Sequence, residues 1–208
     1  MAVKTILTPE WITWGKKQMR NFPNLEGFVA GEGGLKPRAI LIGEAPGARE
    51  IELGHPFMGP AGLELDRMLS SVGLTRADIY ITSPVSSRPF KIGKTNRKSD
   101  RKPTQAEIKA FAPMLDYELS ALPKTLLVPM GNTGLQRLLG TNAKIGKLHG
   151  QLMRRSIRKL NRQTNEFELT VDHYDIFPIY HPSYSKRFKS MKPVVDHDMQ
   201  ELQLLLKK

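Results

Sequence analysis

A cluster of carboxylates and one aromatic side chain lie close together in a segment rich in glycine and proline. The segment spans residues 43–62 and contains Glu44, Glu50 and Phe57. Glycine lets the backbone approach a flat ligand or adopt positive φ, and proline removes competing conformations. A carboxylate can activate water or stabilise a cation, and an aromatic ring can stack on a planar group. The pattern predicts a ligand-binding loop, although a glycine-rich surface loop with scattered acids has the same composition.

Three polar loops, including this one, each follow a short apolar run, and such runs are typical of buried parallel strands. The run at residues 39–42 leads into the glycine-rich loop, the run at 79–82 leads into Ser83, and the run at 176–180 leads into His181. A further strand is predicted over residues 126–130. Because ligands bind at the carboxyl ends of strands in open α/β sheets, we expect these loops to form one site.

Helical spacing of apolar residues alternates with the strands. We expect helices from Thr8-Pro9 onward, over 65–72, after a Thr104/Glu107 capping box, over 132–139 and over 195–206. This alternation predicts an α/β fold, a three-layer α/β/α sandwich with a central, mostly parallel four-stranded sheet. The length of 208 residues suits a single domain, residues 1–208.

The chain carries a formal net charge of +12, which predicts a polyanionic partner. Residues 91–102 form a basic run that we interpret as a flexible DNA-binding loop, and a second run at 154–159 suggests a small basic hairpin turning at 161–165. The second run fits DNA contact and a solvated face equally well. The cations expected to meet phosphate in the first run are Lys94, Arg97, Lys98 and Arg101.

The sequence has no apolar run of membrane-spanning length, and its N-terminus lacks the pattern of a secretory signal. We therefore expect a monomer in the cytoplasm, without contact to a membrane.

Several motifs in a fixed order make the sequence resemble the uracil-DNA glycosylase superfamily, most closely its family-four branch. The motifs are Gly43-Glu44-Ala45-Pro46-Gly47 with Glu50, Pro56-Phe57-x-Gly59-x-Ala61-Gly62, Tyr80-Ile81-Thr82, Arg88-Pro89, Pro103-Thr104-x-x-Glu107-Ile108, Gly131-Asn132 and Tyr180-His181-Pro182-Ser183-Tyr184. The resemblance implies an enzyme that flips a base out of DNA and hydrolyses its N-glycosidic bond.

The resemblance also implies roles for individual residues. Phe57 would stack on the base, and His181 would stabilise the base oxygen on which charge accumulates. Glu44 and Glu50 are alternative candidates for handling the water or the sugar cation. The other implied base contacts are Gly43, Ala45 and Ser83, and the implied DNA contacts after the last strand are Ser183, Lys186 and Arg187.

The chain departs from the family-four pattern at the cluster ligands, because it has no cysteine. An iron–sulfur cluster needs thiolates, so we expect no cluster, no metal site and no other cofactor. Ser87, Phe111 and, more loosely, Trp11 and Trp14 stand at the cysteine positions. We hypothesise that the three aromatic residues pack together there, while the tryptophans alone also fit the inner face of an N-terminal helix.

A second departure is Ser83, where the family usually has an asparagine that reads uracil. A serine offers one hydroxyl and leaves more room, so altered or relaxed base specificity is expected. The leading hypothesis is a monofunctional DNA glycosylase acting on uracil or a related modified pyrimidine. The alternative is a non-catalytic DNA-binding protein on the same scaffold, and an enzyme of free nucleotides is disfavoured by the basic segments.

Overall fold

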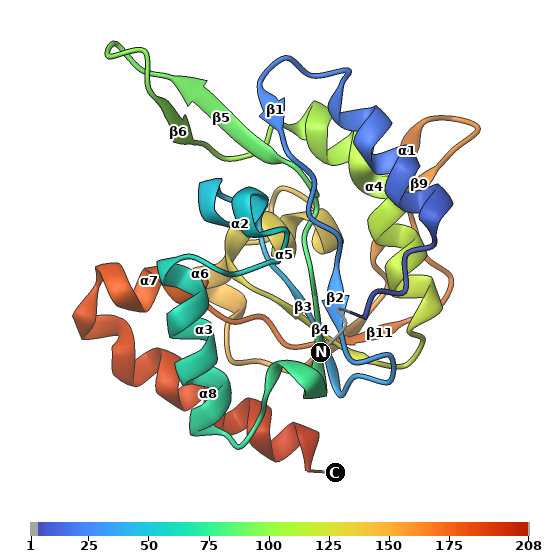
Figure 1. Ribbon diagram of the computed structural model, residues 1–208. Helices are drawn as coiled ribbons and strands as arrows, with labels where there is room; N and C mark the ends of the chain where they lie inside the picture. The colour runs from blue at the N-terminus through green and yellow to red at the C-terminus, as the bar shows by residue number, and fades with distance from the viewer. Residues whose placement is uncertain (1–3, 208) are drawn as a thin grey trace.

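The computed structural model describes residues 4–207. Its centre is a sheet with the strand order β2-β4-β3-β7-β11-β8 (Figure 1). The four inner strands, β4 (Ile79–Thr82), β3 (Ala39–Ile42), β7 (Leu126–Pro129) and β11 (Tyr174–Ile176), run parallel. These are the four predicted strands, except that the last begins and ends earlier than residues 176–180.

Two short antiparallel strands extend the sheet at its edges, so the expected count of four was too low. β2 (Glu32–Gly33) pairs with β4, and β8 (Met153–Arg155) pairs with β11. Neither strand contains an apolar run, because an edge strand is paired on only one side and needs little apolar surface.

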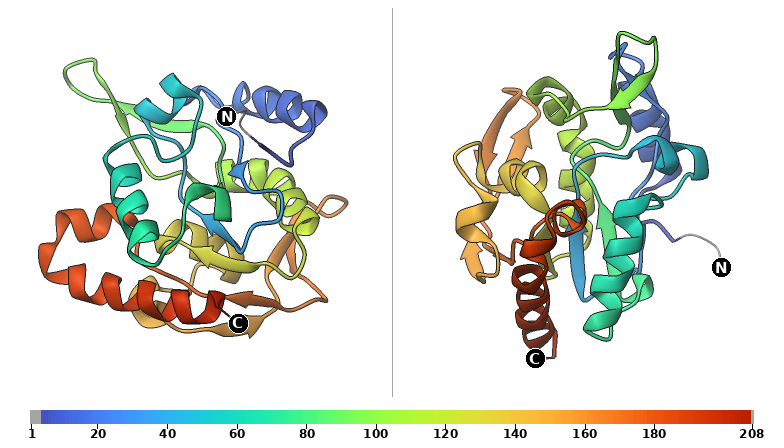
Figure 2. Two further views of the ribbon diagram at one scale, coloured as in Figure 1. Left: turned by 60° about the horizontal axis from the view of Figure 1, so that its bottom comes forward. Right: turned by 90° about the vertical axis from the view of Figure 1, so that its left-hand side faces the viewer.

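Helices cover both faces of the sheet, which confirms the three-layer sandwich (Figure 2). Alternate residues of β3 point to opposite faces: Ala39 and Leu41 contribute to one core, Ile40 and Ile42 to the other. The first core includes α3 (Pro60–Ser71) and α8 (Lys192–Leu206), and the second includes α4 (Gln105–Ala121). The helix α5 (Gly131–Leu139) contributes to both.

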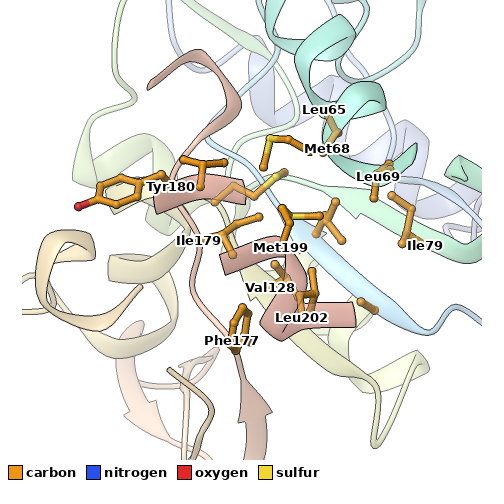
Figure 3. Packing of buried hydrophobic residues seen from close by; sticks show 14 of the residues in the cluster. Leu65, Met68, Leu69, Ile79, Val128, Phe177, Ile179, Tyr180, Met199 and Leu202 are labelled. Carbon is orange, nitrogen blue, oxygen red and sulfur yellow. The ribbon is translucent and has the colours of Figure 1, made fainter. Parts of the chain in front are cut away.

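The first core is rich in methionine and leucine (Figure 3). Met68 from α3 and Met199 from α8 meet above the strands and are almost fully buried. The labelled neighbours are Leu65, Leu69, Ile79, Val128, Phe177, Ile179, Tyr180 and Leu202. This packing holds in place the strands that lead into the three loops predicted to form the site.

The basic segment 91–102 is largely a β-hairpin and not the flexible loop that we expected. β5 (Arg88–Ile92) pairs with β6 (Lys98–Asp100), and β1 (Leu25–Glu26) lies on its other side, so that the hairpin extends from the body (Figure 1). The guanidinium of Arg88 joins all three strands through ion pairs to Glu26 and Asp100, both at 2.6 Å. The sequence hides this hairpin because the outer parts of both strands are solvent-exposed and lack apolar alternation.

The second basic run is divided between two sheets. Arg154 and Arg155 lie in the edge strand β8, whereas Arg158 and Lys159 belong to β9 (Arg158–Asn161). β9 forms the expected hairpin with β10 (Glu166–Leu169), but β10 brings two glutamates that reduce its positive charge. The run is split because Ile157 is buried in the core between the two strands.

The N-terminal helix α1 (Pro9–Met19) begins at the predicted proline. Among the described residues, no helix combines the length and the apolar character that crossing a membrane requires.

Candidate active site

A cleft of about 810 Å³ opens at the carboxyl ends of the parallel strands. Each of the predicted loops contributes to its wall, since the parallel strands all end at this edge. Residues that line it include Glu44, Ala45, Glu50, Phe57, Ser83, Asn132, His181, Ser183, Tyr184 and Arg187. The sequence-predicted catalytic and base-binding side chains are therefore neighbours in space.

Glu44 is held by a residue that the sequence did not single out. Thr133, in the first turn of α5, donates its hydroxyl to Glu44 Oε2 at 2.7 Å. Glu44 Oε1 accepts no hydrogen bond from the described part of the chain. One oxygen is thus fixed while the other can accept from a water or face a cation in the cleft. The only signal for Thr133 was its position after the Gly131-Asn132 motif.

Glu50 has a different environment, because backbone groups occupy both its oxygens. Oε2 accepts from Gly47 N at 3.0 Å, and Oε1 accepts from Met58 N and Gly59 N, each at 2.8 Å. The first bond caps a short helix, α2 (Ala48–Leu53), that we did not predict inside the glycine-rich loop. Glu50 therefore organises the loop from within.

Phe57 adopts a left-handed backbone conformation, with φ of 54°. Its ring packs over Gly43, where a Cβ would lie 3.0 Å from the ring. A methyl group at position 43 would crowd this ring, which would have to shift by a few tenths of an ångström to admit it. The Phe57 and His181 rings lie 5.6 Å apart between centroids and are tilted by 32°.

His181 precedes the helix α7 (Pro182–Arg187) and acts as its N-cap. Its Nδ1 accepts from Ser183 N at 3.2 Å, and the Ser183 hydroxyl lies 2.8 Å from the same atom. A backbone N–H can only donate, so Nδ1 carries no proton and Nε2 carries it. Burial lowers the pKa of His181 to about 4. The side chain is thus a neutral donor, and Ser183, which we expected to contact DNA, fixes its tautomer.

The hydroxyl of Ser83 is also oriented. It donates to the carbonyl oxygen of Val85 at 2.9 Å, which leaves its lone pairs as an acceptor. The preceding residue, Thr82, links this loop to the first one, because its carbonyl accepts from Gly43 N at 2.8 Å.

A buried acid lies behind this wall of the cleft. Glu118 is 1% exposed and accepts from the Thr82 hydroxyl at 2.5 Å and the Tyr80 hydroxyl at 2.9 Å. Burial without a cationic partner raises the pKa of Glu118 to about 7. Nothing in the sequence marked Glu118, which lies in the last turn of helix α4.

The predicted DNA-binding cations fall into two groups. Lys98 pairs with Glu26, and Arg101 pairs with the buried Glu107 at 2.5 Å and 2.8 Å, so both cations already have carboxylate partners within the chain. By contrast, the exposed Lys94 and Arg97 at the hairpin turn form no ion pair with any described residue. The same holds for Lys186 and Arg187 of α7, of which Arg187 lines the cleft.

The place at which family-four proteins would hold a cluster does not suit one here. Ser87 is fully buried, and its hydroxyl has no hydrogen-bond partner in the described structure. Phe111 packs with Leu25, Val85 and Ile108. None of these side chains is a ligand for iron. Within residues 4–207, no group of three or more His, Cys, Asp or Glu side chains is placed to hold a metal ion.

The hypothesised aromatic cluster at this place is divided. Trp11 packs edge-to-face on Trp14, with centroids 5.3 Å apart, and lies against Tyr117 at 5.0 Å. Phe111 belongs to the separate apolar cluster of Leu25, Val85 and Ile108. The tryptophans thus follow the simpler alternative of a helix packing on its neighbour α4.

Comparison with known proteins agrees with this geometry. The model of the uracil DNA glycosylase superfamily matches residues 30–203. The Type-4 uracil-DNA glycosylase of Thermotoga maritima is 29% identical over 188 residues, which cover 89% of this chain and 86% of that protein. The protein of the same name from Saccharolobus solfataricus is 30% identical over 179 residues, covering 84% and 74% respectively.

The fold is shared with a solved structure. The crystal structure of wild-type Pedobacter heparinus SMUG2 matches with a TM-score of 0.56 and 14% identity, covering 83% of this chain and 77% of that one.

Proposed function

This chain belongs to the uracil DNA glycosylase superfamily and is a DNA glycosylase; from that premise we propose that it removes uracil or a related modified pyrimidine from DNA by hydrolysis. The observation that carries the proposal is the meeting of three groups in one cleft. They are the ring of Phe57, the neutral donor His181 and the carboxylate of Glu44, one oxygen of which accepts no hydrogen bond from the described residues. The reaction leaves an abasic site.

Each group has a distinct task. Phe57 stacks on the flipped base. As the bond from C1′ to the base nitrogen breaks, negative charge moves to the base carbonyl oxygen and His181 Nε2–H donates to it. Glu44 orients the water that attacks C1′ or stabilises the positive sugar.

We assign the water to Glu44 and not to Glu50. Three backbone N–H groups already donate to Glu50, whereas only the Thr133 hydroxyl donates to Glu44. Both oxygens of Glu50 are thus engaged by the loop backbone, whereas Glu44 Oε1 accepts no hydrogen bond from the described residues. Glu50 then contributes by shaping the loop.

Base selectivity follows from the orientation of Ser83. An acceptor at this position suits an N–H of the base, such as N3–H of uracil, and repels the bare N3 of cytosine. It supplies no donor for the adjacent O4, which an asparagine amide would provide. We therefore expect discrimination against cytosine but weaker discrimination among bases with an N–H beside a carbonyl.

The test uses duplexes and single strands that carry uracil, hydroxymethyluracil, hypoxanthine, glycosylated cytosine or only normal bases, with abasic sites as the readout. We expect excision of uracil, loss of it in Glu44→Gln, and no change in Glu168→Gln on the distant β10. Ser83→Asn should narrow the range toward uracil. Excision of unmodified cytosine would refute the reading of Ser83.

A second candidate, a non-catalytic DNA-binding protein, is favoured by one observation, the serine at position 83. DNA binding without excision of any tested base would support it and refute the proposed removal of uracil or a related pyrimidine.

A further inference from the structure

Arg76 reaches the backbone of the stacking residue from outside the cleft. It opens the short helix η1 (Arg76–Asp78), directly before β4. Its Nη1 donates to the carbonyl oxygen of Pro56 at 2.9 Å, and its Nη2 donates to that of Phe57 at 2.6 Å. Asp66 of α3 holds the guanidinium in place through Nε at 2.7 Å.

The following peptide groups are held by a second side chain. Met58 N and Gly59 N both donate to Glu50 Oε1. Gly62 packs directly against the same segment, because a Cβ at position 62 would overlap the Phe57 carbonyl oxygen. Arg76 therefore binds the carbonyl oxygens of residues 56 and 57, and Glu50 binds the N–H groups of residues 58 and 59.

We propose that Arg76, anchored by Asp66, is a positioning residue that holds Phe57 in its left-handed conformation and so presents the ring to the flipped base. The proposal rests on the proposed function for the role of the ring. The conformation itself, with φ of 54°, is unfavourable for a residue with a Cβ and persists only where its surroundings impose it.

The exposure of the pair separates this role from general stabilisation. The side chains of Arg76 and Asp66 are 31% and 48% exposed. Ion pairs at such positions contribute little to the stability of a fold. The two charge-assisted bonds to carbonyls, in contrast, act on one turn of backbone. Loss of Arg76 should thus release the loop while the protein stays folded.

A double-mutant cycle tests the coupling. Arg76→Ala should lower kcat/KM for uracil-containing DNA by about 10-fold to 10²-fold, the size expected for a misplaced binding group. In the Phe57→Ala background the same change should cost less than about threefold, because the ring through which it acts is gone. Arg76→Lys should recover only part of the loss, since one ammonium cannot match the planar fork. Equal effects of Arg76→Ala in both backgrounds would overturn the proposal.

Arg67→Ala is the matched control, because Arg67 is 35% exposed, close to the 31% of Arg76, and it also pairs with carboxylates, Glu64 and Asp196. It does not hold the loop, and its kcat/KM should stay within about twofold of the parent, as expected for a surface pair.

Amide hydrogen exchange gives a readout that does not need activity. Exchange at Met58 and Gly59 should accelerate in Arg76→Ala and stay unchanged in Arg67→Ala. Unchanged exchange in both variants would refute the clamp even if the enzyme is active. A parent protein that excises nothing would refute the function while exchange still reports on the clamp.

Discussion

His181 is expected to act as a neutral hydrogen-bond donor across the pH range of the assay. With a pKa of about 4, only about 1% of the imidazole is protonated at pH 6. The excision rate should therefore show no titration of His181 between pH 6 and 8.5. An imidazolium acid with the ordinary pKa near 6.5 would instead lose its proton within this range.

The size of the contribution of His181 to the excision rate can be measured by removing its side chain. His181→Ala deletes one preorganised Nε2–H, and the single-turnover excision rate should fall by about 10²-fold to 10³-fold while DNA affinity changes little. Ser183→Ala is the matched control: it removes the hydroxyl near Nδ1 but keeps the backbone N–H that fixes the tautomer. Its rate should fall by no more than about fivefold, the effect of one neutral hydrogen bond.

The assay is single-turnover excision from a uracil-containing duplex at pH 5 to 8.5, with the parent and both variants. Two results would refute the reasoning. The first is a rate that falls with an apparent pKa near 6.5 in the parent and not in His181→Ala. The second is an equal rate for the parent and His181→Ala.

Three further outcomes follow from the structure. Glu118→Gln should gain stability relative to the parent as pH rises from 5 to 8, because the folded pKa of about 7 exceeds the ordinary carboxyl value of 4.5 and the parent must ionise this buried acid, which costs it about 3 kcal/mol. Chemical denaturation at both pH values checks this, and a constant difference would contradict it. Gly62→Ala should destabilise the protein by about 1–3 kcal/mol or more, seen as a lower Tm, since the new methyl overlaps the Phe57 carbonyl; a wild-type Tm would show that the loop yields freely. Neutralising Lys94 and Arg97 together should reduce the slope of log K against log salt by up to about 2, as each phosphate contact contributes about 0.9; an unchanged slope would return the hairpin turn to the role of a solvated surface.

The sequence predicted the elements whose residues are buried in a regular pattern. Residues 39–42 and 79–82 became β3 and β4 with the expected bounds, because both faces of these strands pack against helices. The edge strands and the hairpin at 88–100 escaped prediction because they lack apolar periodicity. Backbone pairing with neighbouring strands and ion pairs such as Arg88 to Glu26 hold them in place.

The candidate site was predictable in its membership and not in its internal hydrogen bonds. Motif order identified Glu44, Glu50 and His181, but not which carboxylate is occupied by backbone donors. That distinction depends on how the loop folds back on itself, which brings Met58 and Gly59 to Glu50. The spacing of Gly47 and Glu50 is the one local signal that was available, because a glutamate three residues after the N-cap can accept from the N-cap N–H.

The contacts that shape the first loop have a consequence for how this protein can change. Arg76, Glu50 and Gly62 all act on the main chain at and beside position 57. The side chain at that position is therefore free to be exchanged for another unbranched one without loss of the backbone that presents it. We therefore expect such an exchange to leave the loop backbone in place and to change only the surface that the side chain presents to the cleft.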